Sequence, residues 1–295
     1  MYPPERREGF VTSDVGLRLY WEAHGSGPAL VCCNGVGVST FFWKYLVAEF
    51  SDRFTVVLWD YRGHGQSEGP NSPMECDLSI AASARDLLGV LDAAGAEQAV
   101  ALGHSMGCQV ALEAAIQAPK RIKGLVLMQG SAGRVLDTFF DNPSARVLHS
   151  FLMKGADLMG PKFDKLTSPL LNTNLTWEFT WRCGLVDPYY TRKEDFMPYL
   201  EHMARLDTRL FLHMVEEAHH HDAFPLLPTI EQPALVVAAE KDTFTPMWLS
   251  QRIAREMPNA EILVLADATH AAIIEQPDTI NHRVARFLTS VDWES

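Results

Sequence analysis

Residues 98–107, Gln98-Ala99-Val100-Ala101-Leu102-Gly103-His104-Ser105-Met106-Gly107, decide the fold. Ala99 to Leu102 is an apolar run of strand length, and the residues after Gly107 are typical of a helix that ends before Pro119. A serine with a glycine two places away on either side fits a sharp strand-to-helix turn that exposes its hydroxyl group. Such a turn is strained, and a Cβ at either glycine position would crowd it. Ser105 is therefore the candidate nucleophile.

Short apolar runs alternate with helical patterns on both sides of this turn. The predicted strands lie at residues 10–12, 17–22, 29–33, 55–59, 99–102, 124–128, 234–238 and 261–265. This alternation is typical of an α/β fold in which helices flank a mostly parallel sheet. Residues 17–22 alternate between apolar and polar side chains, as an antiparallel edge strand does, so the sheet is predicted to be mixed.

The alternation disappears between residues 134 and 228. Helical patterns there cover 145–154, 175–183 and 195–220, with breaks expected at Pro161, Pro169 and Pro188. We therefore predict a core formed by residues 1–133 and 229–295, and a helical cap at 134–228. As a lid over Ser105, the cap is expected to line an apolar pocket. The aromatic candidates for this lining are Phe139, Phe140, Trp177, Trp181 and Phe224.

Composition restricts the partners and the compartment. The 295 residues carry a formal net charge of −12, which opposes binding to nucleic acid or to anionic membranes. The five cysteines are odd in number and show no C-x-x-C spacing, which favours a reducing, cytoplasmic setting. No signal peptide and no stable membrane insertion are predicted. The expected partner is a small-molecule substrate, and a homo-oligomer is left open.

A serine hydroxyl needs a base to accept its proton, and the base needs a third group to orient it. His270 follows the apolar run 261–265, and Asp242 follows the apolar run 234–238. Side chains that follow parallel strands emerge at the same edge of the sheet as Ser105. Asp267, three residues before His270, is the alternative acid, but a solvated turn role suits it better. The predicted triad is Ser105, His270 and Asp242.

The order Ser, Asp, His, the elbow around Ser105 and the turn at residues 60–67 (DYRGHGQS) together resemble the α/β-hydrolase superfamily over nearly the whole chain. The resemblance implies that the turn supports the site structurally. It also implies an oxyanion hole formed by the backbone N–H groups of Met106 and Val36. The family loop usually reads His-Gly, whereas Asn34 stands in the histidine position here. Asn34 is either a turn residue or a polar group that touches the substrate.

The run His219-His220-His221-Asp222 suggests a metal site at first sight. Successive residues on a helix point about 100° apart, so these side chains cannot converge on one ion. We interpret the run as a solvated helix end and predict neither a metal nor a cofactor.

These features predict a serine esterase that cleaves a carboxylic ester-type bond of an apolar small molecule through an acyl-enzyme. The same residues would serve a lactonase, a thioesterase, a cofactor-free perhydrolase or a carbon–carbon bond hydrolase. A serine at the elbow argues against the dehalogenase and epoxide-hydrolase branches, which place an aspartate there. A small-molecule receptor is the non-enzymatic alternative, and turnover distinguishes it from an enzyme.

Overall fold

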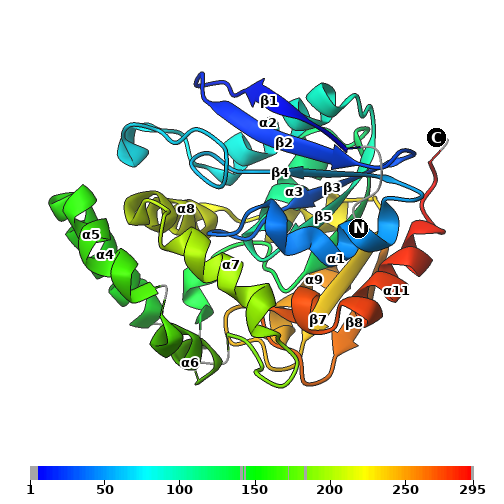
Figure 1. Cartoon of the computed structure of the whole chain (residues 1–295). Coiled ribbons are helices and arrows are strands. Elements are labelled where there is room, and N and C mark those ends of the chain that lie inside the picture. Colours follow the sequence, from blue (N-terminus) through cyan, green and yellow to red (C-terminus); the bar gives the residue numbers. More distant parts are fainter. Residues whose placement is uncertain (1–5, 140–141, 143, 172, 183–184, 294–295) are drawn as a thin grey trace.

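The computed structural model describes residues 6–139, 142, 144–171, 173–182 and 185–293. Within these residues the chain forms one mixed sheet with the strand order β1-β2-β4-β3-β5-β6-β7-β8 (Figure 1). The strands are β1 (Arg6–Thr12), β2 (Arg18–His24), β3 (Ala29–Cys33), β4 (Thr55–Trp59), β5 (Ala99–His104), β6 (Ile122–Met128), β7 (Ala234–Ala239) and β8 (Ala260–Leu265).

The two N-terminal strands are antiparallel and the remaining pairs are parallel. β1 pairs with β2, and β2 pairs with β4, in antiparallel registers, whereas β3 to β8 run in parallel. The central strands are completely buried, in keeping with their continuous apolar sequences. The mixed, mostly parallel sheet predicted from the sequence is therefore confirmed.

Helices cover both faces of the sheet. One face packs against α2 (Ile80–Ala94), α3 (Met106–Gln117) and α9 (Met247–Glu256), and the other against α1 (Lys44–Phe50) and α11 (Pro277–Leu288). Short helices η1 (Thr40–Trp43), η2 (Pro73–Glu75) and α10 (Ala272–Glu275) lie in the loops. Of the helices in the described part of the chain, none is both long and apolar enough to cross a membrane.

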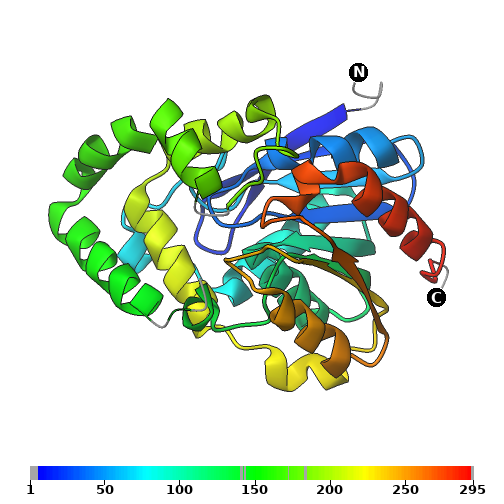
Figure 2. The same cartoon turned by 90° about the horizontal axis from the view of Figure 1, so that it is seen from below.

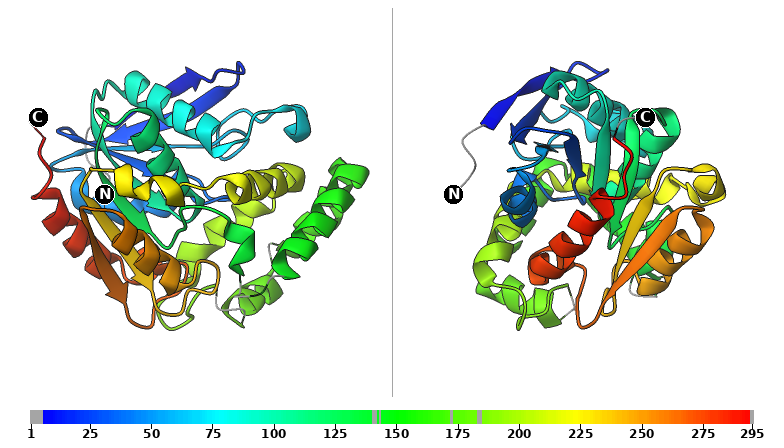
Figure 3. Two further views of the ribbon diagram at one scale, coloured as in Figure 1. Left: turned by 180° about the vertical axis from the view of Figure 1, so that it is seen from behind. Right: turned by 90° about the vertical axis from the view of Figure 1, so that its right-hand side faces the viewer.

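The segment between β6 and β7 supplies the inserted helices. They are η3 (Val135–Asp137), α4 (Ser144–Met159), α5 (Pro161–Leu171), α6 (Asn174–Arg182), α7 (Lys193–Met203), α8 (Thr208–His220) and η5 (Phe224–Thr229). Figure 2 shows that most of them gather at one end of the molecule. In the view from behind in Figure 3, α4 and α5 project to the side opposite the C-terminus.

Two details of this insert differ from the sequence prediction. The helix expected at 195–220 is two helices, because Asp207 caps α8 by accepting the N–H groups of Arg209 and Leu210. The break expected at Pro169 is absent, and α5 continues through it to Leu171. A proline so close to a helix end removes one backbone hydrogen bond without preventing the last turn.

Candidate active site

Ser105 occupies the turn between β5 and α3, as the sequence predicts. Its backbone angles are φ 55° and ψ −121°, a conformation that residues with a Cβ rarely adopt. A Cβ on Gly103 would lie 2.4 Å from the carbonyl oxygen of Gly107, and one on Gly107 would lie 2.0 Å from that of Cys33. Both flanking positions therefore exclude any larger residue, which is the physical basis of the G-x-S-x-G pattern.

The structure brings His270 and Asp242 to Ser105. His270 Nε2 lies 3.0 Å from Ser105 Oγ, and His270 Nδ1 lies 2.9 Å from Asp242 Oδ2. Ser105 follows β5, Asp242 follows β7 and His270 follows β8, so all three side chains meet at the carboxyl edge of the sheet. The arrangement can pass the hydroxyl proton of the serine to an imidazole whose other nitrogen faces a carboxylate.

Asp242 is fixed by hydrogen bonds from its own loop. Its carboxylate accepts the backbone N–H groups of Phe244 and Thr245, each at 2.9 Å, and the hydroxyl group of Thr245 at 2.8 Å. Asp267, the alternative acid, lies at the surface, where its carboxylate pairs with Lys241 Nζ at 2.8 Å. The geometry therefore favours Asp242 as the partner of His270.

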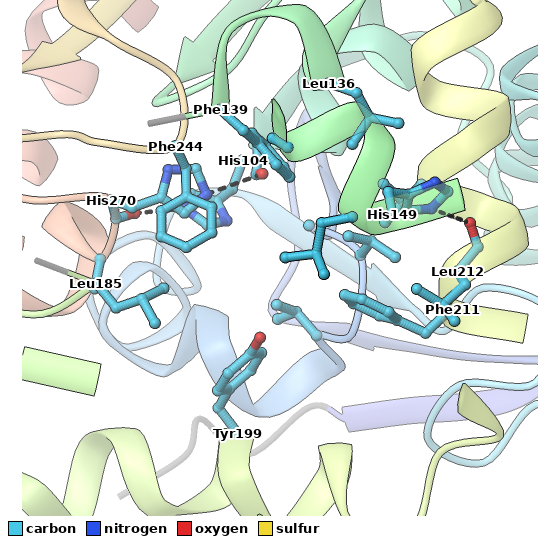
Figure 4. A pocket seen from close by; sticks show the side chains of 18 of the residues that line it. His104, Leu136, Phe139, His149, Leu185, Tyr199, Phe211, Leu212, Phe244 and His270 are labelled. Carbon is cyan, nitrogen blue, oxygen red and sulfur yellow. Dashed lines mark hydrogen bonds between the residues drawn. The ribbon is translucent and has the colours of Figure 1, made fainter. Parts of the chain in front are cut away.

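His104, inside the elbow motif, holds the backbone of the candidate base. Its Nε2–H donates to the carbonyl oxygen of His270 at 2.9 Å, and the two rings lie 5.1 Å apart (Figure 4). Burial lowers the pKa of His104 to about 3, so the ring is neutral at ordinary pH. Its place next to the serine is the signal in the sequence that points to this supporting role.

The loop after β3 approaches the elbow closely. A Cβ on Gly35 would lie 3.1 Å from His104 Nδ1 and 3.2 Å from Ser105 Cβ, so a larger residue would force its neighbours to shift by a few tenths of an ångström. Val36 follows in the same loop and lines the cavity above Ser105. Met106 begins α3, where the first N–H groups of a helix have no intrahelical acceptor. Their role as oxyanion donors stays a prediction.

A cavity of about 500 Å³ opens directly above Ser105. Its wall is mostly apolar and combines core loops with inserted helices. The main lining residues are Val36, Val38, Phe42, Leu136, Phe139, Leu148, His149, Leu152, Leu185, Phe196, Tyr199, Phe211, Leu212, Val215 and Phe244. In Figure 4 the hydroxyl group of Tyr199 points into this space. Burial raises the pKa of Tyr199 to about 12, so it is a neutral hydrogen-bond donor.

Comparison with known proteins assigns the chain to a family. The family model described as alpha/beta hydrolase fold matches residues 28–277. The chain belongs to this family. It is 28% identical over 276 residues to "Putative carbamate hydrolase RutD" of Azorhizobium caulinodans, covering 93% of this chain and 96% of that protein.

Solved structures give the same result. A hydrolase from Pseudomonas aeruginosa PA01 superposes with a TM-score of 0.75 at 26% identity, covering 96% of this chain and 99% of that one. A thermophilic esterase from Thermogutta terrifontis superposes with a TM-score of 0.74 at 24% identity, with 97% and 98% covered, and this likeness concerns the fold. The fold and the names of the relatives support hydrolase activity.

In this α/β hydrolase, Asn34 supports the loop and is not among the residues that line the cavity above Ser105. Its side chain is buried, donates to the carbonyl oxygen of Trp59 at 2.7 Å and accepts the indole N–H of Trp43 at 2.7 Å. Its own carbonyl oxygen accepts the hydroxyl group of Tyr61 at 2.9 Å. Of the two roles that the sequence left open for Asn34, the structure favours the turn residue, because every polar atom of its side chain is already bonded within the core.

Of the aromatic residues predicted to line the pocket, the described cavity wall contains Phe139 only. Trp177 packs against Phe196 at 5.8 Å, and Trp181 is partly exposed beside Arg182. Phe224 is buried in η5, where the guanidinium group of Arg252 lies 3.8 Å from its ring centroid. Phe140 lies outside the described residues. Trp177, Trp181 and Phe224 therefore lie off the described wall, because helical periodicity marks an apolar face without saying what that face covers.

The lining residues that sequence reasoning missed come mainly from α4, α7 and α8. Leu148, Leu152, Tyr199, Phe211 and Leu212 belong to amphipathic helices in which they cannot be told from core positions. The aromatic or Met-rich composition of the segment indicates that it lines a pocket. It does not indicate which individual positions face that pocket.

The consecutive histidines at the end of α8 face different partners. His219 Nε2 lies 3.9 Å from Asp137, His220 Nε2 lies 3.3 Å from Glu216, and His221 Nε2 lies 3.2 Å from Glu113. Within the described part of the chain, no group of three or more His, Cys, Asp or Glu residues is arranged to hold a metal ion. The three histidines therefore make separate polar contacts at the end of the helix.

Proposed function

We propose that this protein is a serine hydrolase that cleaves a carboxylic ester-type bond of an apolar small molecule through an acyl-enzyme. The observation that carries the proposal is the 3.0 Å contact between His270 Nε2 and Ser105 Oγ at the floor of an apolar cavity. A serine activated in this way attacks a carbonyl carbon, and the cavity above it accepts the apolar part of the molecule.

Acylation begins when His270 Nε2 takes the hydroxyl proton and Ser105 Oγ forms a bond to the carbonyl carbon. The carbonyl oxygen becomes an oxyanion, and the backbone N–H groups of Val36 and Met106 are the proposed donors to it. The tetrahedral intermediate then collapses. The bond to the alcohol oxygen breaks, and the imidazolium returns its proton to that oxygen, so the alcohol leaves neutral.

Deacylation repeats the sequence with water as the nucleophile. His270 accepts a proton from water, the hydroxyl oxygen adds to the acyl carbon, and the collapse expels Ser105 Oγ, which takes the proton back. The carboxylic acid leaves, and the free enzyme is restored. Asp242, bonded to His270 Nδ1 at 2.9 Å, keeps the imidazole in the required orientation and stabilises its charged form.

The wall of the cavity supports an apolar substrate. Aliphatic and aromatic side chains provide most of its surface, so a charged group bound there would lose its hydration without a matching partner. The name of the Azorhizobium relative mentions a carbamate, and a carbamate also presents a carbonyl carbon to the serine. An apolar carbamate is therefore the second candidate substrate class.

A substrate panel tests the proposal. We expect p-nitrophenyl esters to be hydrolysed over many turnovers. Esters of different acyl chain length show which acyl group is preferred, and a lactone, a thioester and an aryl carbamate assayed alongside show which type of bond is preferred. Ser105→Ala is expected to remove turnover, and a serine-reactive phosphonate is expected to label Ser105 by mass spectrometry. At most one equivalent of product would support a receptor, and unchanged activity in Ser105→Ala would refute the nucleophile.

Substitutions in the wall of the cavity test whether the insert acts as a cap. Phe139→Ala enlarges the cavity and is expected to shift the preferred acyl chain toward longer esters. Trp181→Ala is the matched control, because Trp181 lies off the described wall on α6. If folded Phe139→Ala prefers the same acyl chain length as the wild type, the proposed role of this wall is contradicted.

A further inference from the structure

Gly37 is held by two imidazole rings that the triad does not use. It lies in a turn closed by the hydrogen bond from Val38 N–H to the carbonyl oxygen of Gly35, and its φ of 75° suits glycine at this turn position. The N–H of Gly37 donates to His64 Nε2 at 3.1 Å, and its carbonyl oxygen accepts the Nδ1–H of His202 at 3.0 Å. The backbone N–H and the carbonyl oxygen of Gly37 are therefore both hydrogen-bonded to histidine side chains.

The hydrogen bonds define one protonation state for each ring. His202 donates from Nδ1 to Gly37, so its Nε2 is the acceptor for the N–H of Gly65 at 2.9 Å. His64 accepts at Nε2, so its Nδ1–H donates to the carbonyl oxygen of Arg62 at 3.2 Å. An added proton on either ring would turn an acceptor into a donor that faces a backbone N–H.

His202 joins parts of the chain that are far apart in sequence. It belongs to α7 of the insert, whereas Gly37 belongs to the loop after β3 and Gly65 to the turn after β4. The loop also carries Val36, the proposed oxyanion donor, directly beside Gly37. The position of that donor therefore depends on a side chain from the inserted helices.

The surroundings of His202 keep its ring neutral. Burial lowers its pKa, Arg205 lowers it further, and the hydrogen bond to Gly37 opposes both. His64 faces it from the turn at a ring distance of 5.7 Å, and burial lowers the pKa of His64 to about 3. The Asp60 carboxylate lies behind Gly65, where it accepts the N–H of Gln66 at 2.9 Å.

We propose that His202 is a positioning residue that ties Gly37 to the turn after β4 and so holds the oxyanion loop in place, and that protonation at its Nε2 reduces turnover at acidic pH. The added proton makes Nε2 a donor that faces the N–H of Gly65, so the ring leaves this contact and the loop loses its support. The proposal rests on the ester hydrolysis proposed above. His202 does not touch the substrate in this account. A displaced loop weakens the stabilisation of the oxyanion more than substrate binding, so the effect falls on kcat and leaves KM little changed.

Three variants test the proposal against p-nitrophenyl esters. His202→Ala is expected to lower kcat about 10- to 100-fold with KM within about threefold, in the range that misplaced catalytic groups cost. His202→Asn is expected to recover much of kcat, because its amide can occupy the Nδ1 position, donate to Gly37 and remain uncharged at any pH. His220→Ala, an exposed histidine on α8, is the control and is expected to leave kcat unchanged.

The pH profile and an NMR signal separate positioning from general support of the fold. The acidic decline of kcat in His202→Asn should involve one ionisation fewer than in the wild type. The 15N–1H resonance of Gly37 should move with pH in the wild type and stay fixed in His202→Asn. Its amide reports the loop without any substrate, so the positioning can be judged even if no ester is hydrolysed.

Each outcome assigns the failure to one proposal. No turnover by the wild type, with the pH-dependent Gly37 resonance present, would refute the ester activity while supporting the loop contact. Turnover that is lost in Ser105→Ala but kept within twofold in His202→Ala would overturn the positioning role. A Gly37 resonance that does not respond to pH in the wild type would overturn it as well.

Discussion

The strain at Ser105 predicts that removing its Cβ stabilises the protein while abolishing its activity. We compare Ser105→Gly with Ser105→Ala, because both variants lack the hydroxyl group and differ only in the Cβ. A residue with a Cβ at φ 55° and ψ −121° carries a backbone cost of about 1–3 kcal/mol. Glycine relieves this cost but raises the entropy of the unfolded chain, which lowers stability by about 0.5–1 kcal/mol.

The difference predicts that Ser105→Gly is more stable than Ser105→Ala by up to about 2.5 kcal/mol. Urea denaturation followed by tryptophan fluorescence measures both free energies of unfolding at one pH, and equal m-values show that the same unfolding is compared. The ester assay on the same samples should show both variants inactive. A Ser105→Gly protein less stable than Ser105→Ala would refute the claim that the elbow stores strain.

Asp242→Asn is expected to lower kcat for a p-nitrophenyl ester by two or more orders of magnitude, whereas Asp267→Asn should change kcat less than twofold. The reverse ranking would assign the acid of the triad to Asp267. The free energy of unfolding should fall as the pH drops below about 6.5, because the unfolded chain protonates histidines whose folded pKa values, for His64 and His104, are lowered to about 3. Burial raises the pKa of Asp60 to about 6, so that residue takes up one proton on folding and opposes the loss, leaving a slope of about 1.4 kcal/mol per pH unit between pH 6 and 5. Denaturation curves at several pH values measure this slope. A free energy of unfolding that rises on acidification would contradict the lowered histidine pKa values.

The sequence predicted the core accurately where local signals and burial agree. Helix α2, at Ile80–Ala94, agrees with its local signals, because Ser79 accepts the N–H of Ala82 at its start and Gly95 ends it at φ 75°. The strands at 29–33 and 55–59 also match, since both are short apolar runs buried on both faces. In these elements the local pattern and the tertiary environment require the same structure.

The candidate triad was predictable for a related reason. Topology places the ends of parallel strands along one edge, so the positions of Ser105, Asp242 and His270 after three apolar runs were enough to bring them together. The wall of the cavity follows no such rule. Trp177 and Tyr199 both lie on apolar faces of inserted helices, yet only Tyr199 reaches the cavity, because helix docking decides which face meets which surface.

The insert is hydrogen-bonded to the loops on both sides of Ser105, so the inserted helices and the candidate triad share supporting contacts. Glu275 accepts the N–H of Thr269, the neighbour of His270, at 2.8 Å and also the N–H of Asp187 and the hydroxyl group of Thr191, which precede α7. His202, on α7, bonds to the loop on the other side. These contacts are short-range and directional, so α7 cannot shift by an ångström without disturbing one of them. Substitutions that move the inserted helices should therefore alter kcat as well as specificity, even where no substituted residue touches the serine.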